Sequence, residues 1–102
     1  MQRTIKPQDL NPAAVVLLDV RREADLAASN EALPGATWKN PEQIDGWIAA
    51  LPRTQDVVLY CVRGGSVSNS VVDKLQAAGV RARFIEGGIE GYKAAGGEVV
   101  GK

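Results

Sequence analysis

The 102-residue sequence contains no histidine and only one cysteine, Cys61. One cysteine cannot form an intrachain disulfide. Without histidine, the chain also lacks the commonest zinc ligand and the commonest acid/base group at neutral pH. Zinc chemistry and catalysis by Ser-His or Cys-His pairs are therefore close to excluded. We expect neither a metal nor a cofactor.

Long apolar runs and blocks of like charge are also missing. The 12 Lys+Arg residues balance the 12 Asp+Glu residues. This balance argues against a basic surface for nucleic-acid phosphates and hence against a nucleic-acid partner. No apolar run is long enough to span a bilayer, and residues 1–7 lack the apolar core of a secretory signal. We therefore expect a cytoplasmic protein with no membrane partner.

What the sequence does contain is an alternation of strand and helix signals without repeats or linkers. Its length suits a single domain, residues 1–102, with a core of its own. Two nearly unbroken apolar runs, 15–18 and 57–60, predict strands that are buried on both faces. The alternating segment 81–85 predicts a half-covered or edge-side strand.

Helix signals separate these strands. Helices are expected over 22–28, 40–51, 67–78 and 89–95. The second begins with the N-cap residue Asn40 followed by Pro41, and it should bury one apolar side, formed by Ile44, Trp47, Ile48 and Leu51. The glycine-rich C-terminus is expected to fray. Strand, helix and strand in repetition predict an α/β fold: a mostly parallel central sheet with helices on both faces.

The loop 61–66, Cys-Val-Arg-Gly-Gly-Ser, joins the second buried strand to the third helix. Ligands of parallel sheets bind outside the carboxyl ends of the strands. The two glycines let successive N–H groups curl toward one point, and the helix that follows adds its positive dipole end. Such a nest binds anions, and it should hold an exposed Cys61 sulfur as a thiolate. We interpret Cys61 as a nucleophile; the alternative is a buried, inert cysteine.

Four motifs resemble those of the rhodanese-like sulfurtransferases, in particular the single-domain members. The matching segments are 17–21 (Leu-Leu-Asp-Val-Arg), 33–36 (Leu-Pro-Gly-Ala), the active loop 60–66, and 87–92 (Gly-Gly-Ile-Glu-Gly-Tyr). The sequence departs from the family pattern at Glu31-Ala32, where many members have Gly-His, and at Tyr92, where tryptophan is usual. The resemblance covers nearly the whole chain and implies a rhodanese-like fold.

The resemblance also implies a cysteine persulfide on Cys61. The thiolate attacks the outer sulfur of thiosulfate or a similar donor, sulfite leaves, and a thiophilic acceptor such as cyanide, glutathione or a protein thiol takes the sulfur. Sulfite leaves without being protonated, so an enzyme without histidine can perform this reaction. Most of the rate acceleration must then come from groups that bind and position the anionic donor. We assign this role to Val62, Arg63, Gly64, Gly65 and Ser66.

Several residues have two interpretations each. Arg63 either holds a sulfonate oxygen of thiosulfate or points into solvent. Ser66 either donates toward the sulfur or caps the next helix, a position that Gly65 also suits. Asp19 and Arg21 are expected to support the site, as a pair or as a brace for the active loop, although ordinary strand-end turn chemistry also explains Asp19.

Two rival functions remain. A cysteine phosphatase requires an arginine six positions after the cysteine, and Val67 stands there, which argues against that activity. The more serious rival is a rhodanese-like module that carries persulfide to a dedicated partner, or that only binds a protein. Carrier and enzyme differ in the acceptor, which the sequence does not identify.

Overall fold

The two apolar runs form the centre of a parallel sheet. In the computed structural model, which describes residues 3–101, β2 (Val16–Asp19) lies beside β5 (Asp56–Tyr60), with Asp19 opposite Tyr60. The sheet has five strands in the order β1-β6-β5-β2-β4, and each neighbouring pair is parallel. The other strands are β1 (Thr4–Ile5), β4 (Thr37–Trp38) and β6 (Arg81–Ile85). The prediction of a mostly parallel α/β sheet is confirmed.

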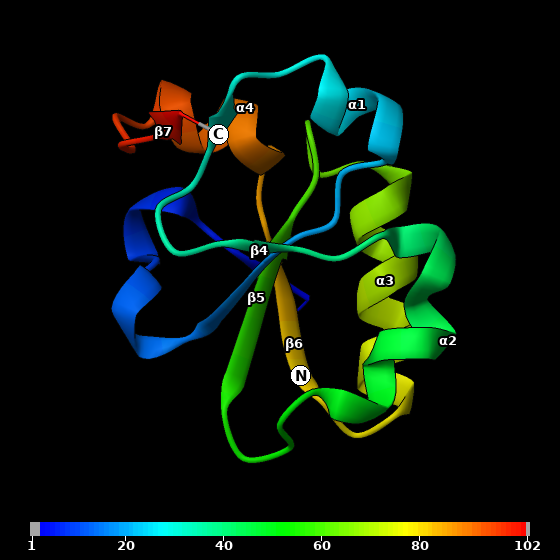
Figure 1. Cartoon of the computed structure of the whole chain (residues 1–102). Coiled ribbons are helices and arrows are strands. Elements are labelled where there is room, and N and C mark those ends of the chain that lie inside the picture. The colour runs from blue at the N-terminus through cyan, green and yellow to red at the C-terminus, as the bar shows by residue number, and fades with distance from the viewer. Residues whose placement is uncertain (1–2, 102) are drawn as a thin grey trace.

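Successive side chains of the central strands enter two separate cores, because side chains of a strand alternate between its faces. Leu18, Val57 and Leu59 pack on one face with residues of α2 (Ile44–Trp47) and α3 (Ser66–Ala77). Leu17, Val58 and Tyr60 pack on the other with Ile89 and Tyr92 of α4 (Gly88–Ala94). Figure 1 shows α2 and α3 together on one side of the sheet. Helices therefore cover both faces, as predicted.

The remaining helical segments connect the strands. They are the 3-10 turns η1 (Pro7–Asp9) and η2 (Pro12–Ala14), the helix α1 (Glu23–Ala27), and the 3-10 turns η3 (Pro41–Gln43) and η4 (Ile48–Ala50). Helix α1 follows β2, and α3 follows β5, so both begin at the carboxyl-end side of the sheet (Figure 1). Within residues 3–101, no helix is long and apolar enough to cross a membrane.

The helix expected over 40–51 is broken into η3, α2 and η4. Its start is as predicted, since the Asn40 side chain accepts a hydrogen bond from the Glu42 amide at 3.0 Å. Its apolar side also packs into the core as expected, with Ile44 and Leu51 buried. Gly46, a poor helix former, lies in the middle of the segment. The apolar spacing thus predicted the buried side correctly but not the continuity of the helix.

The last described residues, 100 and 101, are paired and not frayed. Strand β7 (Val100–Gly101) pairs antiparallel with β3 (Glu31–Ala32). Position 97, where the chain turns back, requires glycine, because a Cβ there would lie 2.4 Å from the ring of Tyr92. The expectation of a frayed end is wrong because it weighed only the local flexibility of glycine and not this long-range contact.

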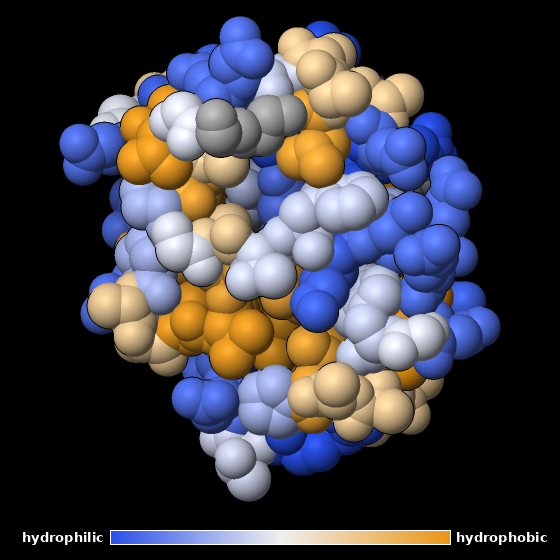
Figure 2. All heavy atoms as spheres, viewed as in Figure 1, coloured by the Kyte–Doolittle hydropathy of each residue, from blue (hydrophilic) through white to orange (hydrophobic). Residues whose placement is uncertain are grey.

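The sheet edge at β4 is only partly covered. Strand β4 pairs with Leu18 and Asp19 and leaves the first half of β2 without a neighbour on that side. Figure 2, in the view of Figure 1, shows an apolar area below β4 with polar residues around it. The segment 81–85, expected to be half-covered or near an edge, forms β6, which lies one strand in from the edge strand β1.

Candidate active site

The cysteine loop lies where the two central strands end. Cys61 follows β5 directly, and the amide of Val20, just after β2, donates to the Tyr60 carbonyl at 2.9 Å. The chain segments that leave β2 and β5 therefore run side by side at the carboxyl edge of the sheet. This is the edge where a parallel sheet binds its ligands.

The first two carbonyls of the loop are bonded to α4, and its amides have no acceptor among the described residues. The carbonyl oxygens of Cys61 and Val62 accept hydrogen bonds from the amides of Ile89 (2.9 Å) and Glu90 (3.1 Å) in the first turn of α4. In the part of the chain that the structure describes, no hydrogen bond uses an amide of residues 62–66 as its donor. These N–H groups are therefore available to an anion, as the predicted nest requires.

Glycine is required where the loop meets α4. Gly88 has φ +62°, and a Cβ on it would lie 2.4 Å from the Cys61 carbonyl oxygen. Gly64 has φ +70°, and a Cβ on it would lie 3.0 Å from the Gly87 amide nitrogen. The backbones of the two segments thus touch with no room for a side chain. The segment 87–88 therefore meets a backbone demand.

Cys61 lines a cleft of about 370 Å³ together with residues of the loop and of the segment after β2. The lining residues are Arg22, Asp25, Cys61, Val62, Arg63, Gly65, Ser66 and Val67. Cys61 itself is only 6% exposed, so the expectation of an exposed thiol is wrong. The Cys61 carbonyl is bonded to the first turn of α4, and the residue, although buried, remains in the wall of the cleft.

Charged side chains of both signs line this cleft. Arg22 and Arg63 are exposed, and neither forms an ion pair or a side-chain hydrogen bond within residues 3–101. Asp25 offsets part of their positive charge. Ser66 is the first residue of α3 and is exposed in the cleft, whereas Gly65 occupies the N-cap position and no side chain caps the helix. Gly64 is the one proposed loop residue that does not line the cleft.

Asp19 and Arg21 form a buried ion pair next to the loop. Arg21 Nη2 lies 2.6 Å from Asp19 Oδ2 and donates to the Glu31 carbonyl at 2.9 Å. The Tyr60 hydroxyl donates to Asp19 Oδ2 at 3.1 Å and accepts from the Leu33 amide at 3.2 Å. Because Tyr60 directly precedes Cys61, this network ties the strand end under the loop to the turn at 33–36.

The ionisation of this network follows from its surroundings. Burial lowers the pKa of Arg21, but its hydrogen bond to Asp19 and the charge of Asp19 more than offset this, and the pKa is raised. Burial raises the pKa of Tyr60, and the charge of Asp19 adds to the effect. Arg21 is therefore charged and Tyr60 neutral. Neither Asp19 nor Arg21 lines the cleft of Cys61. Asp19 instead contacts Tyr60, the last residue of the strand that leads into the loop.

The two tryptophans have structural contacts. Trp38 Nε1 donates to the Arg21 carbonyl at 2.8 Å, and Trp47 Nε1 donates to the Asn40 carbonyl at 2.8 Å. Both side chains are partly buried, and neither lines the cleft of Cys61.

The sequence reasoning missed Arg22 and Asp25 as residues of the cleft. The motif that indicated the site lies in the cysteine loop after β5, whereas these two residues reach the cleft from the segment after β2. The register that puts Asp19 opposite Tyr60 brings residues 20–25 beside the cysteine loop. Only the correct register between the two predicted strands could have indicated that these residues lie beside the loop.

Fold and site together define the chain as a parallel α/β domain with a cysteine in an amide-lined loop at the sheet's carboxyl edge. The model of the rhodanese-like domain family matches residues 6–95. The chain belongs to this family, and at the family level it has the capacity for sulfur transfer.

Solved structures agree with this assignment. A rhodanese-related protein from Thermoplasma volcanium superimposes with a TM-score of 0.85 at 26% identity, covering 97% of this chain and 98% of that one. A rhodanese-like domain protein from Staphylococcus aureus gives a TM-score of 0.78 at 22% identity over 99% of both chains, which supports the fold.

Curated relatives are much longer proteins. The tRNA 2-selenouridine synthase of Shewanella sp. (strain ANA-3) is 32% identical over 72 residues, which cover 71% of this chain and 19% of that protein. The enzyme of the same name from Aeromonas salmonicida is 45% identical over 47 residues, or 46% of this chain and 13% of that protein. The chain thus spans about a fifth or less of the curated relatives it matches.

Proposed function

We propose that the chain transfers sulfane sulfur from thiosulfate, or a similar donor, to a thiophilic acceptor through a persulfide on Cys61. The observation that carries the proposal is that the loop amides of residues 62–66, next to the cysteine, have no acceptor in the part of the chain that the structure describes. Preorganised N–H donors stabilise negative charge on the sulfur and on the bound donor without having to reorient during the reaction. Helix α3, 12 residues long, begins in the same loop and adds its positive end.

The first half-reaction needs no acid or base. The Cys61 thiolate attacks the outer sulfur of thiosulfate, so a sulfur–sulfur bond forms to Cys61 while the bond to the sulfonate sulfur breaks. Sulfite leaves with the electron pair of that bond, and the persulfide keeps one negative charge. In the second half-reaction, the acceptor attacks the outer sulfur of the persulfide and releases the Cys61 thiolate. The absence of histidine is compatible with both steps.

Roles for the other residues follow from their places. Arg63 lines the cleft and forms no ion pair with any of the described residues, and we assign it to the sulfonate of the donor. Val62, Gly65 and Ser66 supply amides from the cleft wall, and Gly64 gives the loop its curvature. Asp19 and Arg21 support the strand end that carries Cys61.

The proposal is tested by incubating the protein with thiosulfate and measuring its intact mass. We expect the mass of one added sulfur atom, lost on addition of cyanide or dithiothreitol. The control is Cys61→Ser, which should gain no mass. Failure of the native protein to gain the sulfur, or an equal gain in the variant, contradicts the proposal.

A second candidate function is a persulfide carrier for a dedicated partner. The small share of each curated relative that the chain covers favours it, since the matched region there belongs to a much larger protein. Those relatives are named for a tRNA product, so the expectation of no nucleic-acid partner stays a prediction for this chain. A carrier would load sulfur from thiosulfate yet release it only slowly to cyanide and small thiols, whereas an enzyme would turn over with them.

A further inference from the structure

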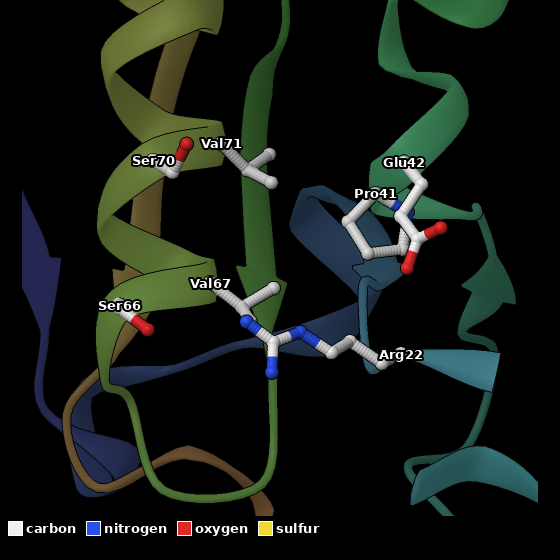
Figure 3. A pocket seen from close by; sticks show the side chains of 7 residues that line it. All are labelled: Arg22, Pro41, Glu42, Ser66, Val67, Ser70 and Val71. Atoms are coloured by element: carbon white, nitrogen blue, oxygen red, sulfur yellow. The ribbon is translucent and has the colours of Figure 1, made fainter. Parts of the chain in front are cut away.

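A second pocket continues from the cleft of Cys61 along α3. It has a volume of about 270 Å³ and is lined by Arg22, Pro41, Glu42, Ser66, Val67, Ser70 and Val71. Arg22, Ser66 and Val67 line both this pocket and the Cys61 cleft, so the two are neighbouring parts of one depression. Figure 3 shows the second pocket between the start of α3 and the segment that begins at Pro41.

Two opposite charges face this pocket from different segments. In Figure 3, Arg22 extends across the pocket toward Val67, and the carboxylate of Glu42 turns toward the Arg22 side chain from the other wall. Both residues are exposed, and they form no ion pair with each other or with any other residue among 3–101. The pocket therefore offers one free cation and one free anion to a ligand.

The rest of the lining separates into an apolar and a polar part. Pro41 and Val67 supply apolar surface, and Ser66 and Ser70, one helical turn apart on α3, supply hydroxyl groups. Thiosulfate does not match this lining, because Glu42 would repel a dianion and the apolar surface would gain nothing from it. A ligand with both charges and a short apolar stem matches all three features.

We infer that this pocket is the acceptor subsite and that it takes a small thiol with an α-amino-acid head group. Its carboxylate pairs with Arg22, its ammonium pairs with Glu42, and its methylene lies on Val67. The thiol then points along the shared wall toward Cys61. This inference rests on the proposed function, because it assigns the second substrate of the same site.

The sulfur transfer to an acceptor bound in this subsite needs no further reactant. The acceptor thiolate attacks the outer sulfur of the Cys61 persulfide, so a sulfur–sulfur bond forms to the acceptor and the bond to Cys61 Sγ breaks. The products are the acceptor persulfide and the Cys61 thiolate, with the same total charge as the reactants. Arg22 and Glu42 take no part in the bond changes, and they determine which thiol is held in position.

The test uses the full chain loaded with sulfur from thiosulfate and then freed of the donor. Loss of the added sulfur is followed by intact mass with four acceptors: cysteine, 3-mercaptopropionate, cysteamine and 2-mercaptoethanol. They carry both charges, only the carboxylate, only the ammonium, and neither. Each variant is compared with the native protein for the same acceptor, so the different reactivities of the four thiols cancel.

We expect Arg22→Ala to slow transfer to cysteine and 3-mercaptopropionate about threefold, the usual size for a solvent-exposed charge pair, and not to slow transfer to cysteamine or 2-mercaptoethanol. Glu42→Gln should slow transfer to cysteine and cysteamine by a similar factor and spare 2-mercaptoethanol. Arg83→Ala is the matched control, since Arg83 lines a different pocket, beside β1. It should leave all four rates unchanged.

Two other results have distinct meanings. If the protein loads sulfur but each variant changes all four rates equally, or changes none, the subsite assignment is wrong and the proposed function stands. If the protein never loads sulfur from thiosulfate, the proposed function fails and the acceptor subsite falls with it. Arg22 and Glu42 are exposed and outside the core, so both variants are expected to fold, and a thermal unfolding curve checks this.

Discussion

Arg63 is the charged residue of the cysteine loop, and its role depends on where its side chain can reach. It is exposed, lines the cleft of Cys61 and forms no ion pair within residues 3–101 that would hold it elsewhere. A guanidinium in this position can donate to the oxygens of a sulfonate. At the residue scale, then, the candidate site combines one cysteine, the backbone amides around it and a cation that forms no ion pair within residues 3–101.

We predict that Arg63→Ala raises the KM for thiosulfate about threefold to tenfold, the range between an exposed pair and a hydrogen bond to a charged group. The measurement is steady-state kinetics with cyanide as acceptor, and Arg83→Ala is again the control. The KM for cyanide should stay unchanged. Native kinetics in the Arg63 variant would instead place this side chain in solvent.

At the scale of elements, the loop depends on α4 as much as on β5 and α3, which flank it in the chain. The first turn of α4 holds the carbonyls of Cys61 and Val62 by hydrogen bonds of 2.9 and 3.1 Å. Because these carbonyls point toward α4, the amides that follow them are left free for the ligand. Gly88 allows this contact, since any Cβ would collide with the Cys61 carbonyl.

We predict that Gly88→Ala slows formation of the persulfide by at least tenfold, because displacing loop donors by even an ångström disrupts the geometry of attack. Gly79→Ala is the matched control. Gly79 also has a positive φ (+84°), but a Cβ added there would meet no atom within 4 Å. Gly79→Ala should lose about 1–2 kcal/mol of stability from the strained backbone. Gly88→Ala should lose more, because its Cβ also collides with the Cys61 carbonyl, and only Gly88→Ala should lose rate. Equal rates in the two variants would refute the role given to this contact.

At the scale of the whole molecule, the buried network of Asp19, Arg21 and Tyr60 couples the stability of the fold to pH. Burial raises the pKa of Tyr60 in the folded protein. The unfolded chain releases the phenol proton near the ordinary value of about 10. Above that pH the unfolded state therefore binds fewer protons than the folded state, and the free energy of unfolding falls as pH rises.

We predict that the free energy of unfolding falls above about pH 10 with a slope that includes about 1.4 kcal/mol per pH unit from Tyr60. Tyr60→Phe should remove this part of the slope. The variant should also lose about 1–3 kcal/mol at neutral pH, because the Leu33 amide loses its acceptor. Urea unfolding at several pH values measures both effects. Parallel pH profiles for the two proteins would show that Tyr60 ionises alike in both states.

Whole-molecule topology also explains which segments the sequence could not predict. Strands β1, β3, β4 and β7 are two residues each, too short to show the alternation that identifies a strand. They form because a longer strand, or another short strand, offers hydrogen-bonding partners for their backbones. The central strands and the long helix α3 were predicted because their own apolar spacing requires burial.

The sequence by itself determined the α/β sheet, its family and the single cysteine in a glycine-containing loop, because these depend on local spacing and on residue types. Only the tertiary structure decided what surrounds that cysteine. It placed the loop carbonyls on α4 and covered most of Cys61, and it brought Arg22, Asp25 and Glu42 into the depression beside it. These residues come from separate segments, so their contacts follow from strand register and helix packing, which no local pattern encodes.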